Sequence, residues 1–257
     1  MIKTDILIIG AGPTGLFTVF EAGLLKMKCH ILDSLAQPGG QCIELYPKKP
    51  IYDIPAYPEI IAGDLIENLL EQIKPFNPSY TLGETALNLD KLDDGSFKVT
   101  TDKGTEILAR VIAIAGGLGT FTPRKPNISN ITDFEDKGIL YMIKDPSEFK
   151  DKTVVIAGGG DSALDWSIHL SKISKKVILI HRRNEFRGAN DSVDSVQKLK
   201  NLGKIDVITP AQVIKLNGKN KLETIIVDVN GNENEIETDY FIPLFGLVPK
   251  LGPIKDW

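Results

Sequence analysis

The chain is poor in cysteine, in long apolar runs and in net charge. Two cysteines among 257 residues, Cys29 and Cys42, are too few for a disulfide scaffold and favour a reducing, cytoplasmic setting. No apolar run, the stretch Val111–Ala115 included, approaches the roughly 18 residues of a membrane span, so we expect no membrane association. The start has neither an extended apolar region nor a cleavage site, so we expect no secretory signal. A net charge of −4 argues against nucleic-acid binding.

The chain is also poor in the side chains of acid–base and metal chemistry. Of its three histidines, His30 falls in an apolar strand pattern and His169 in a helical one, so both are interpreted as structural. The sequence has no Ser–His–Asp arrangement, no metal-ligand spacing and no P-loop. We therefore predict no catalytic side chain and no metal.

The composition is that of an ordinary globular protein, and the first half of the sequence contains one recognisable motif. Apolar residues make up 42% and charged residues 25%, and the length suits about two domains. The apolar run Thr4–Ile9 leads into the glycine-rich turn Gly10–Gly15, and a helical pattern follows it. A second apolar run, Cys29–Leu32, ends at Asp33. This order predicts a βαβ unit.

The turn fits the dinucleotide-binding fingerprint, because it joins a strand to a helix and an acid follows at about the twenty-residue spacing. Gly10 would make the tight turn, Gly12 would let the backbone approach a pyrophosphate, and Gly15 would let helix and strand pack closely. The helix N-terminus favours phosphate, and Asp33 can accept bonds from ribose hydroxyls. The alternative is a turn whose glycines serve packing alone.

The rest of the first half is less regular. We expect a loop without helix or strand period from Gln37 to Pro58 and a helix over Asp64–Lys74. A hairpin is expected from Phe97–Thr100 and Thr105–Arg110, followed by a separate buried strand at Val111–Ala115.

The order of strand, glycine-rich turn, helix and strand then repeats in the second half of the chain. A strand at Thr153–Ala157 leads into the turn Gly158–Ala163, a helix follows, and a strand at Val177–Ile180 ends at His181-Arg182-Arg183. A meander over Val213–Glu237 and a strand at Tyr240–Phe245 complete it. We predict an α/β fold of two Rossmann-like dinucleotide-binding domains. Their predicted limits are residues 1–118 and 119–246, with residues 247–257 starting a return to the first domain.

The two copies differ in charge at one equivalent point. Asp33 closes the first unit, and a carboxylate there favours a free 2′-hydroxyl and repels a 2′-phosphate. Arg182 and Arg183 close the second, with Arg187 just beyond, and guanidinium groups favour that phosphate. The contrast predicts one site for an ADP-ribose with a free 2′-hydroxyl and one for NADP, and the usual pair is FAD and NADPH. The alternative is that these arginines are only solvated surface charge.

Several segments together resemble one family. They are Gly10–Gly15, Gly39-Gly40-Gln41-Cys42, Leu45-Tyr46-Pro47, Ile51–Pro55, Gly158–Ala163 and His181-Arg182-Arg183. They look like the thioredoxin-reductase-like ferredoxin–NADP(+) reductases, over nearly the whole chain. The resemblance implies FAD in the first domain, NADP(H) in the second, ferredoxin or a similar small iron–sulfur protein as partner, and a cytoplasmic homodimer.

The resemblance also assigns site residues. Thr14 and the glycines would contact the FAD pyrophosphate, Asp33 the adenosine ribose, and Gln41 the flavin. Tyr46 would stack on the flavin ring, and Asp53 would lie near it. Weaker matches, Ala86 and Phe121, would also touch FAD. The second site would comprise Gly158, Gly160, Asp161, Ser162, Ala163, His181, Arg182, Arg183 and Arg187, with His181 beside the phosphate.

The cysteines separate this chain from relatives with a redox dithiol. Thioredoxin reductases carry a C-x-x-C pair before the second βαβ unit, where Gly138–Pro146 holds no cysteine. Glutathione-reductase-like enzymes carry a C-x4-C pair. Here Cys42 matches the first cysteine, but Pro47 stands where the second would be. Electrons are therefore expected to leave for a one-electron carrier such as ferredoxin. Another acceptor remains an alternative.

Family members continue beyond Trp257 with a further FAD-binding segment. We therefore expect this sequence to lack that segment, to expose apolar surface and to hold FAD less tightly. A second alternative follows, namely a fragment that binds NADP without turnover.

Overall fold

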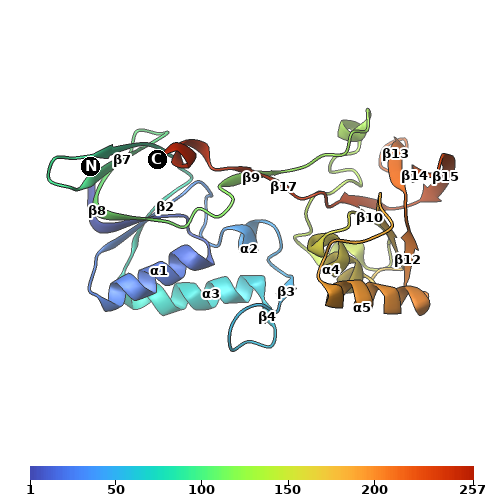
Figure 1. Ribbon diagram of the computed structural model, residues 1–257, viewed down its shortest axis with the longest axis horizontal. Coiled ribbons are helices and arrows are strands. Elements are labelled where there is room, and N and C mark those ends of the chain that lie inside the picture. The colour runs from blue at the N-terminus through green and yellow to red at the C-terminus, as the bar shows by residue number, and fades with distance from the viewer. The chain divides into compact units, whose positions relative to one another are not determined.

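The computed structural model describes residues 1–257 apart from the side chain of Phe121. It divides into two compact units, of which the first comprises Met1–Phe121 with Pro249–Trp257 and the second comprises Thr122–Val248 (Figure 1). No helix in the described part of the chain is long and apolar enough to cross a membrane.

The first unit is built on a six-stranded sheet in the order β5-β2-β1-β8-β7-β6. Strands β5, β2, β1 and β8 are parallel, whereas β7 and β6 run antiparallel to their neighbours. The strands are β1 (Ile2–Ile9), β2 (Cys29–Asp33), β5 (Ser79–Leu82), β6 (Ala86–Lys91), β7 (Phe97–Thr101) and β8 (Glu106–Ile114). The other elements are α1 (Pro13–Leu24), α2 (Gln41–Glu44), β3 (Pro50–Ile51), β4 (Ile60–Ile61), α3 (Ala62–Ile73), η1 (Lys74–Phe76) and η4 (Gly252–Asp256).

The alternation of apolar residues along β1 explains how this sheet is covered. Ile6 and Ile8 face a core shared with Leu16 of α1 and Ile66 of α3, which lie side by side under the sheet (Figure 1). The alternate residues of β1 face a second core with β7 and β8, on which Trp257 packs. The helices therefore leave the carboxyl ends of β1 and β2, and the turn at Gly10, at one edge of the sheet.

Two expectations for this unit were wrong. The segment from Gln37 to Pro58 is not free of regular structure, because it contains α2 and β3; both are too short to produce a sequence period. Val111–Ala115 is not a separate buried strand. It continues β8 from the hairpin arm as far as Ile114. Val111 and Ile114 are 44% and 56% exposed although they face opposite sides of the sheet, so neither face of this part of β8 is fully covered in the described structure.

The second unit repeats the design with a four-stranded parallel sheet in the order β12-β11-β10-β16. Its elements are β10 (Thr153–Ala157), α4 (Asp161–Leu170), β11 (Lys176–Ile180), α5 (Asn190–Asn201), β12 (Ile205–Ile208), β13 (Gln212–Asn217), β14 (Thr224–Val229), β15 (Asn232–Glu237) and β16 (Tyr240–Pro243), with η2 (Ile131–Asp133) and η3 (Pro146–Phe149) before them. The meander β13-β14-β15 packs Ile225 and Val227 against Val155 and Ile178 of the sheet. The predicted α/β class is confirmed.

Two elements of this unit, α5 and β12, were not predicted from the sequence. Val196 is the one buried residue of α5 among those described, and the apolar residues Val193, Val196 and Leu199 form only a sparse pattern in an otherwise polar helix. Two strands join the units and pair with each other, β9 (Thr120–Pro123) and β17 (Leu247–Lys250).

Candidate dinucleotide sites

The first glycine turn joins β1 to α1, and each glycine has a distinct environment. Gly10 has a φ of +111°, and a side chain there would overlap the backbone of Ala115. A methyl group at Gly15 would overlap the carbonyl of Gly10. A methyl group at Gly12 would meet no atom within 4 Å. Only Gly12 therefore leaves open space, which is where the fingerprint requires room for a pyrophosphate.

The open space lies at the N-terminus of α1. Gly12 caps this 12-residue helix without a side-chain hydrogen bond, and no acidic side chain occupies the first turn. Thr14 is exposed in that turn. Free backbone N–H groups and the positive end of the helix dipole suit a phosphate group.

Asp33 lies at the end of β2, directly beside this turn. Its carboxylate accepts hydrogen bonds from the backbone N–H of Ala11 at 2.5 Å and of Leu35 at 2.8 Å. Each oxygen retains a further lone pair, so the carboxylate can still accept from a ribose hydroxyl.

The segment Gly83–Thr85, which was not predicted from the sequence, borders Asp33 and leads to the predicted contact Ala86. The N–H of Glu84 donates to the carbonyl of Asp33, and the Glu84 carboxylate accepts from the Thr101 hydroxyl at 2.5 Å. Ala86 is 2% exposed, so its side chain belongs to the core and only its backbone is available to a ligand. A Gly-Glu-Thr run between two strands carried no signal beyond that of a turn.

The predicted flavin contacts lie on and after α2. Gln41 begins α2, Tyr46 is half-buried just beyond it, and Asp53 is exposed in the following loop. Tyr46 donates its hydroxyl to the Cys42 thiol, and burial, then Cys42 and Asp53, raise the pKa of Tyr46 to about 12. The tyrosine therefore presents a neutral ring. The side chain of Phe121, a further predicted contact, lies outside the described structure.

Neither cysteine has the features of a redox thiol. Cys29 and Cys42 are both free and buried. Burial is the main cause that raises the pKa of each thiol. Because the thiolate is the reactive form, raised pKa values make both groups poor nucleophiles.

The second glycine turn joins β10 to α4 and has the same division of roles. A methyl group at Gly158 would lie 2.7 Å from Cβ of Ala163 and from the carbonyl oxygen of Leu244, whereas one at Gly160 would meet nothing within 4 Å. Ala163 is fully buried. Asp161 and Ser162 are exposed in the first turn of α4. The open position again lies at a helix N-terminus.

The loop after β11 folds back onto this turn. The N–H of Arg187 donates to the carbonyl of Gly159 at 2.6 Å, and the N–H of Ala189 donates to the Asp161 carboxylate at 2.7 Å. Arg182, Arg183 and Arg187 are exposed on this loop. The structure thus brings three guanidinium-bearing residues to the loop that covers the open turn.

His181 differs from the arginines that follow it. His181 is buried, with 5% of its surface exposed. Burial, and then the charges of Arg187, Arg182 and Arg183, lower the pKa of His181, while a bond to the Glu185 backbone partly opposes this. The ring is therefore neutral at pH 7.

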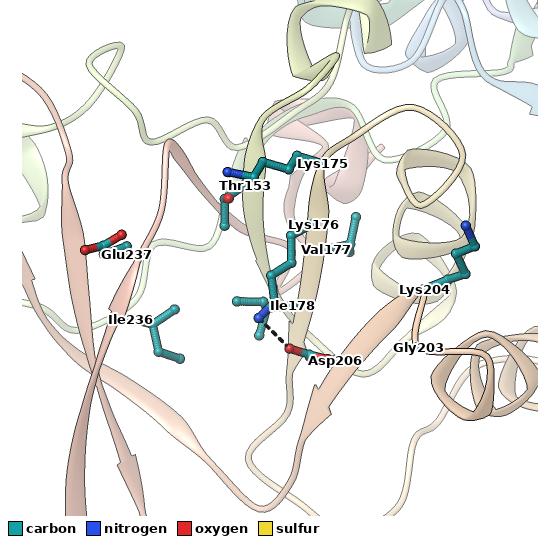
Figure 2. Close-up of a pocket in the computed structure, with 10 residues that line it drawn as sticks. All are labelled: Thr153, Lys175, Lys176, Val177, Ile178, Gly203, Lys204, Asp206, Ile236 and Glu237. Atoms are coloured by element: carbon teal, nitrogen blue, oxygen red, sulfur yellow. Dashed lines mark ion pairs between the residues drawn. The ribbon is translucent and has the colours of Figure 1, made fainter.

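A cavity of about 530 Å³ opens at the opposite edge of the second sheet. Figure 2 shows Lys175, Lys176 and Lys204 around it, with the ion pair between Lys176 and Asp206 at 2.8 Å. These residues lie at or before the amino ends of β11 and β12, whereas the glycine turn follows the carboxyl end of β10. The cavity is therefore separate from the candidate dinucleotide site.

Comparisons with known proteins agree with this architecture. Residues 4–254 match the family model described as pyridine nucleotide-disulphide oxidoreductase. The chain is 67% identical over its full length to a ferredoxin–NADP reductase of Flavobacterium johnsoniae, of which it covers 73%, and 49% identical to one of Rickettsia rickettsii, of which it covers 76%.

Solved structures share the fold at lower identity. A thioredoxin reductase of T. acidophilum is 24% identical with a TM-score of 0.84, over 100% of this chain and 81% of that one. A thioredoxin reductase of Lactococcus lactis is 22% identical with a TM-score of 0.79, over 95% and 78%.

Proposed function

Because the chain belongs to the pyridine nucleotide-disulphide oxidoreductase family, we propose that it transfers electrons between NADPH and ferredoxin through FAD. The observation that carries this proposal is the contrast between two otherwise equivalent turns. Both open at a helix N-terminus, but Asp33 borders the first, whereas a loop with Arg182 and Arg183 covers the second. The ferredoxin–NADP reductases to which the chain is similar support the choice of reaction.

The first unit is proposed to hold FAD. Gly12 and Thr14 at the N-terminus of α1 receive the pyrophosphate, and Gly10 and Gly15 give the turn its shape. Asp33 binds the ribose. Gln41, Tyr46 and Asp53 border the flavin ring, and Tyr46 offers a flat neutral surface for stacking. The backbone of Ala86 and the residue Phe121 complete the set as proposed contacts.

The second unit is proposed to hold NADP(H). Gly160, Asp161 and Ser162 at the N-terminus of α4 receive the pyrophosphate, while Gly158 and Ala163 pack the turn. Arg182, Arg183 and Arg187 bind the 2′-phosphate, because paired N–H groups of guanidinium suit phosphate oxygens. His181 is not part of this clamp, since its ring is buried.

FAD, when bound, would supply the chemistry, since a flavin can accept a hydride and pass on single electrons. The chain's residues bind and orient the two dinucleotides, and no side chain is required as acid or base. Because Cys29 and Cys42 are free and buried, the electrons leave for a one-electron carrier instead of a dithiol. The names of the relatives favour ferredoxin over another acceptor.

Three further statements complete the proposal. The protein works in the cytoplasm, as a homodimer, and without binding nucleic acid or membrane. The low cysteine content supports the cytoplasmic location, and the net charge of −4 supports the absence of nucleic-acid binding. The homodimer rests on the resemblance to the reductase family.

The test is an acceptor assay on the 257-residue protein supplied with excess FAD and NADPH. We expect a reduced ferredoxin to accumulate, and Arg182→Glu to slow its formation. Free flavin and a quinone are assayed in parallel. Turnover with a quinone alone would replace the proposed acceptor, and the absence of turnover with all three would contradict the reductase assignment.

A further inference from the structure

We propose that His181 is a positioning residue, which packs on Gly159 to hold the basic loop against the second glycine turn and does not contact the cofactor's 2′-phosphate. The inference rests on the proposed binding of NADPH in the second unit. It assigns to His181 a role different from that of the three arginines after it.

The ring of His181 fills the space under the turn. A methyl group at Gly159 would overlap three ring atoms of His181, namely Cε1, Nδ1 and Nε2. On the loop side, the ring stacks with Phe186 at a centroid distance of 5.5 Å and an interplanar angle of 27°. The imidazole is thus a spacer between Gly159 and the basic loop.

The backbone holds this spacer in place. The N–H of His181 donates to the carbonyl of Ile208 at 3.2 Å, and its carbonyl accepts from the N–H of Ala211 at 2.8 Å. One residue after Phe186, the N–H of Arg187 donates to the carbonyl of Gly159 at 2.6 Å. The ring therefore cannot swing away from the turn without breaking contacts on both sides.

The polar atoms of the ring do not point to a phosphate contact. The imidazole ring forms a hydrogen bond to the backbone of Glu185. Nε2 is buried and has no hydrogen-bond partner among the described residues. A neutral ring has one donor nitrogen, so a ring that donates to the backbone of Glu185 has no second proton to offer a phosphate.

The sequence explains why this arrangement needs Gly159. The second turn has glycine at three consecutive positions, Gly158 to Gly160, whereas the first has Ala11 at the middle position. In the second turn, the ring of His181 lies on the middle residue, Gly159. The additional glycine is accounted for by the His181 ring.

The decisive experiment is a compensating pair of substitutions. Gly159→Ala would push its methyl group into the ring and should weaken binding of NADPH and NADH by roughly tenfold or more, because overpacking displaces the turn. His181→Ala removes the ring, so the double variant Gly159→Ala with His181→Ala should recover most of that loss. Dissociation constants are measured by titration of the 257-residue protein.

Gly160→Ala is the matched control. Its methyl group meets no protein atom, so the fold should tolerate it, but it fills the space reserved for the pyrophosphate. It should weaken binding in the same range, and His181→Ala should not restore it. The inference would be overturned if His181→Ala restored the cofactor affinity of Gly160→Ala, or if it failed to restore that of Gly159→Ala.

The single variants separate packing from phosphate binding. His181→Ala should weaken NADPH and NADH by the same factor, since both use the turn. His181→Phe keeps an aromatic ring and removes both ring nitrogens, so if packing is the role of this residue, binding should stay within about threefold of the wild type. A loss confined to NADPH in either variant would overturn the inference. Wild-type protein that fails to bind NADPH would instead contradict the proposed function.

Discussion

At the scale of single residues, the proposed function depends on the charge that follows a strand at each glycine turn. The two turns share glycine spacing, open space and an uncapped helix N-terminus. They differ in the residues that follow the next strand, Asp33 in one case and the Arg182–Arg187 loop in the other. This difference is electrostatic, so it is open to test by charge reversal.

Arg182→Glu should lower the affinity for NADPH on the order of tenfold to a hundredfold while changing that for NADH little, because a charge-assisted bond to the phosphate is replaced by repulsion. Titration of both cofactors measures the ratio. Arg110→Glu, an equal charge change at an exposed position of the first unit, is the control. An unchanged ratio in Arg182→Glu would contradict the assignment of NADP to this site.

His30 should make stability depend on pH. It is 1% exposed, its ring nitrogens contact the hydroxyls of Ser79 at 2.7 Å and Thr81 at 2.9 Å, and burial, then Lys28, lower its pKa. The unfolded chain therefore binds a proton that the folded one does not. Stability should be full above about pH 6.5 and fall as the pH decreases below it.

The measurement is the free energy of unfolding in urea at pH 8 and pH 5.5. The wild type should lose more of it between these pH values than His30→Gln, which has no ring to protonate. Equal losses in both proteins would show that the buried ring does not contribute.

At the scale of elements, the second sheet is held by the meander on one face. Ile225 of β14 is fully buried in the core shared with Val155 and Ile178. Ile225→Ala should cost about 2–5 kcal/mol of the free energy of unfolding, as large-to-small core changes do.

Ile214 of the neighbouring strand β13 provides the control, because it is 39% exposed. Ile214→Ala should cost less than about 1 kcal/mol. Urea denaturation followed by circular dichroism compares the two. Similar costs would mean that the meander does not share a core with the sheet.

The elements also show how far the sequence predicts the fold. The strand at Thr153–Ala157 was predicted at its observed limits because both its faces are buried, which gives a continuous β-branched run. The helix α5 was missed because it buries Val196 alone, and α2 because four residues carry no period. Burial, and not the presence of an element, is what a sequence pattern records.

The same reasoning applies to the sites. The roles of Gly10 and Gly160 could be anticipated from spacing, since turn geometry is local. The packing of His181 on Gly159 could not, because it depends on how the loop after β11 folds back over 20 residues of chain. The link between Glu84 and Thr101 is tertiary in the same sense.

At the scale of the whole molecule, the two sites belong to separate compact units with separate cores. Asp33→Ala should therefore lower the FAD bound to the purified protein and leave its affinity for NADPH unchanged. Flavin absorbance and NADPH titration measure the two independently. A loss of NADPH binding in this variant would mean that the two sites have been assigned the wrong way round.

The central claim is that one chain binds FAD and NADPH and passes electrons between them. The most direct measurement loads the purified 257-residue protein with FAD, removes unbound flavin and oxygen, and records visible absorption while NADPH is added. The account predicts a bound flavin band that bleaches on addition of NADPH. A protein that stays colourless after incubation with FAD, or a bound flavin band that NADPH leaves unchanged, would contradict it.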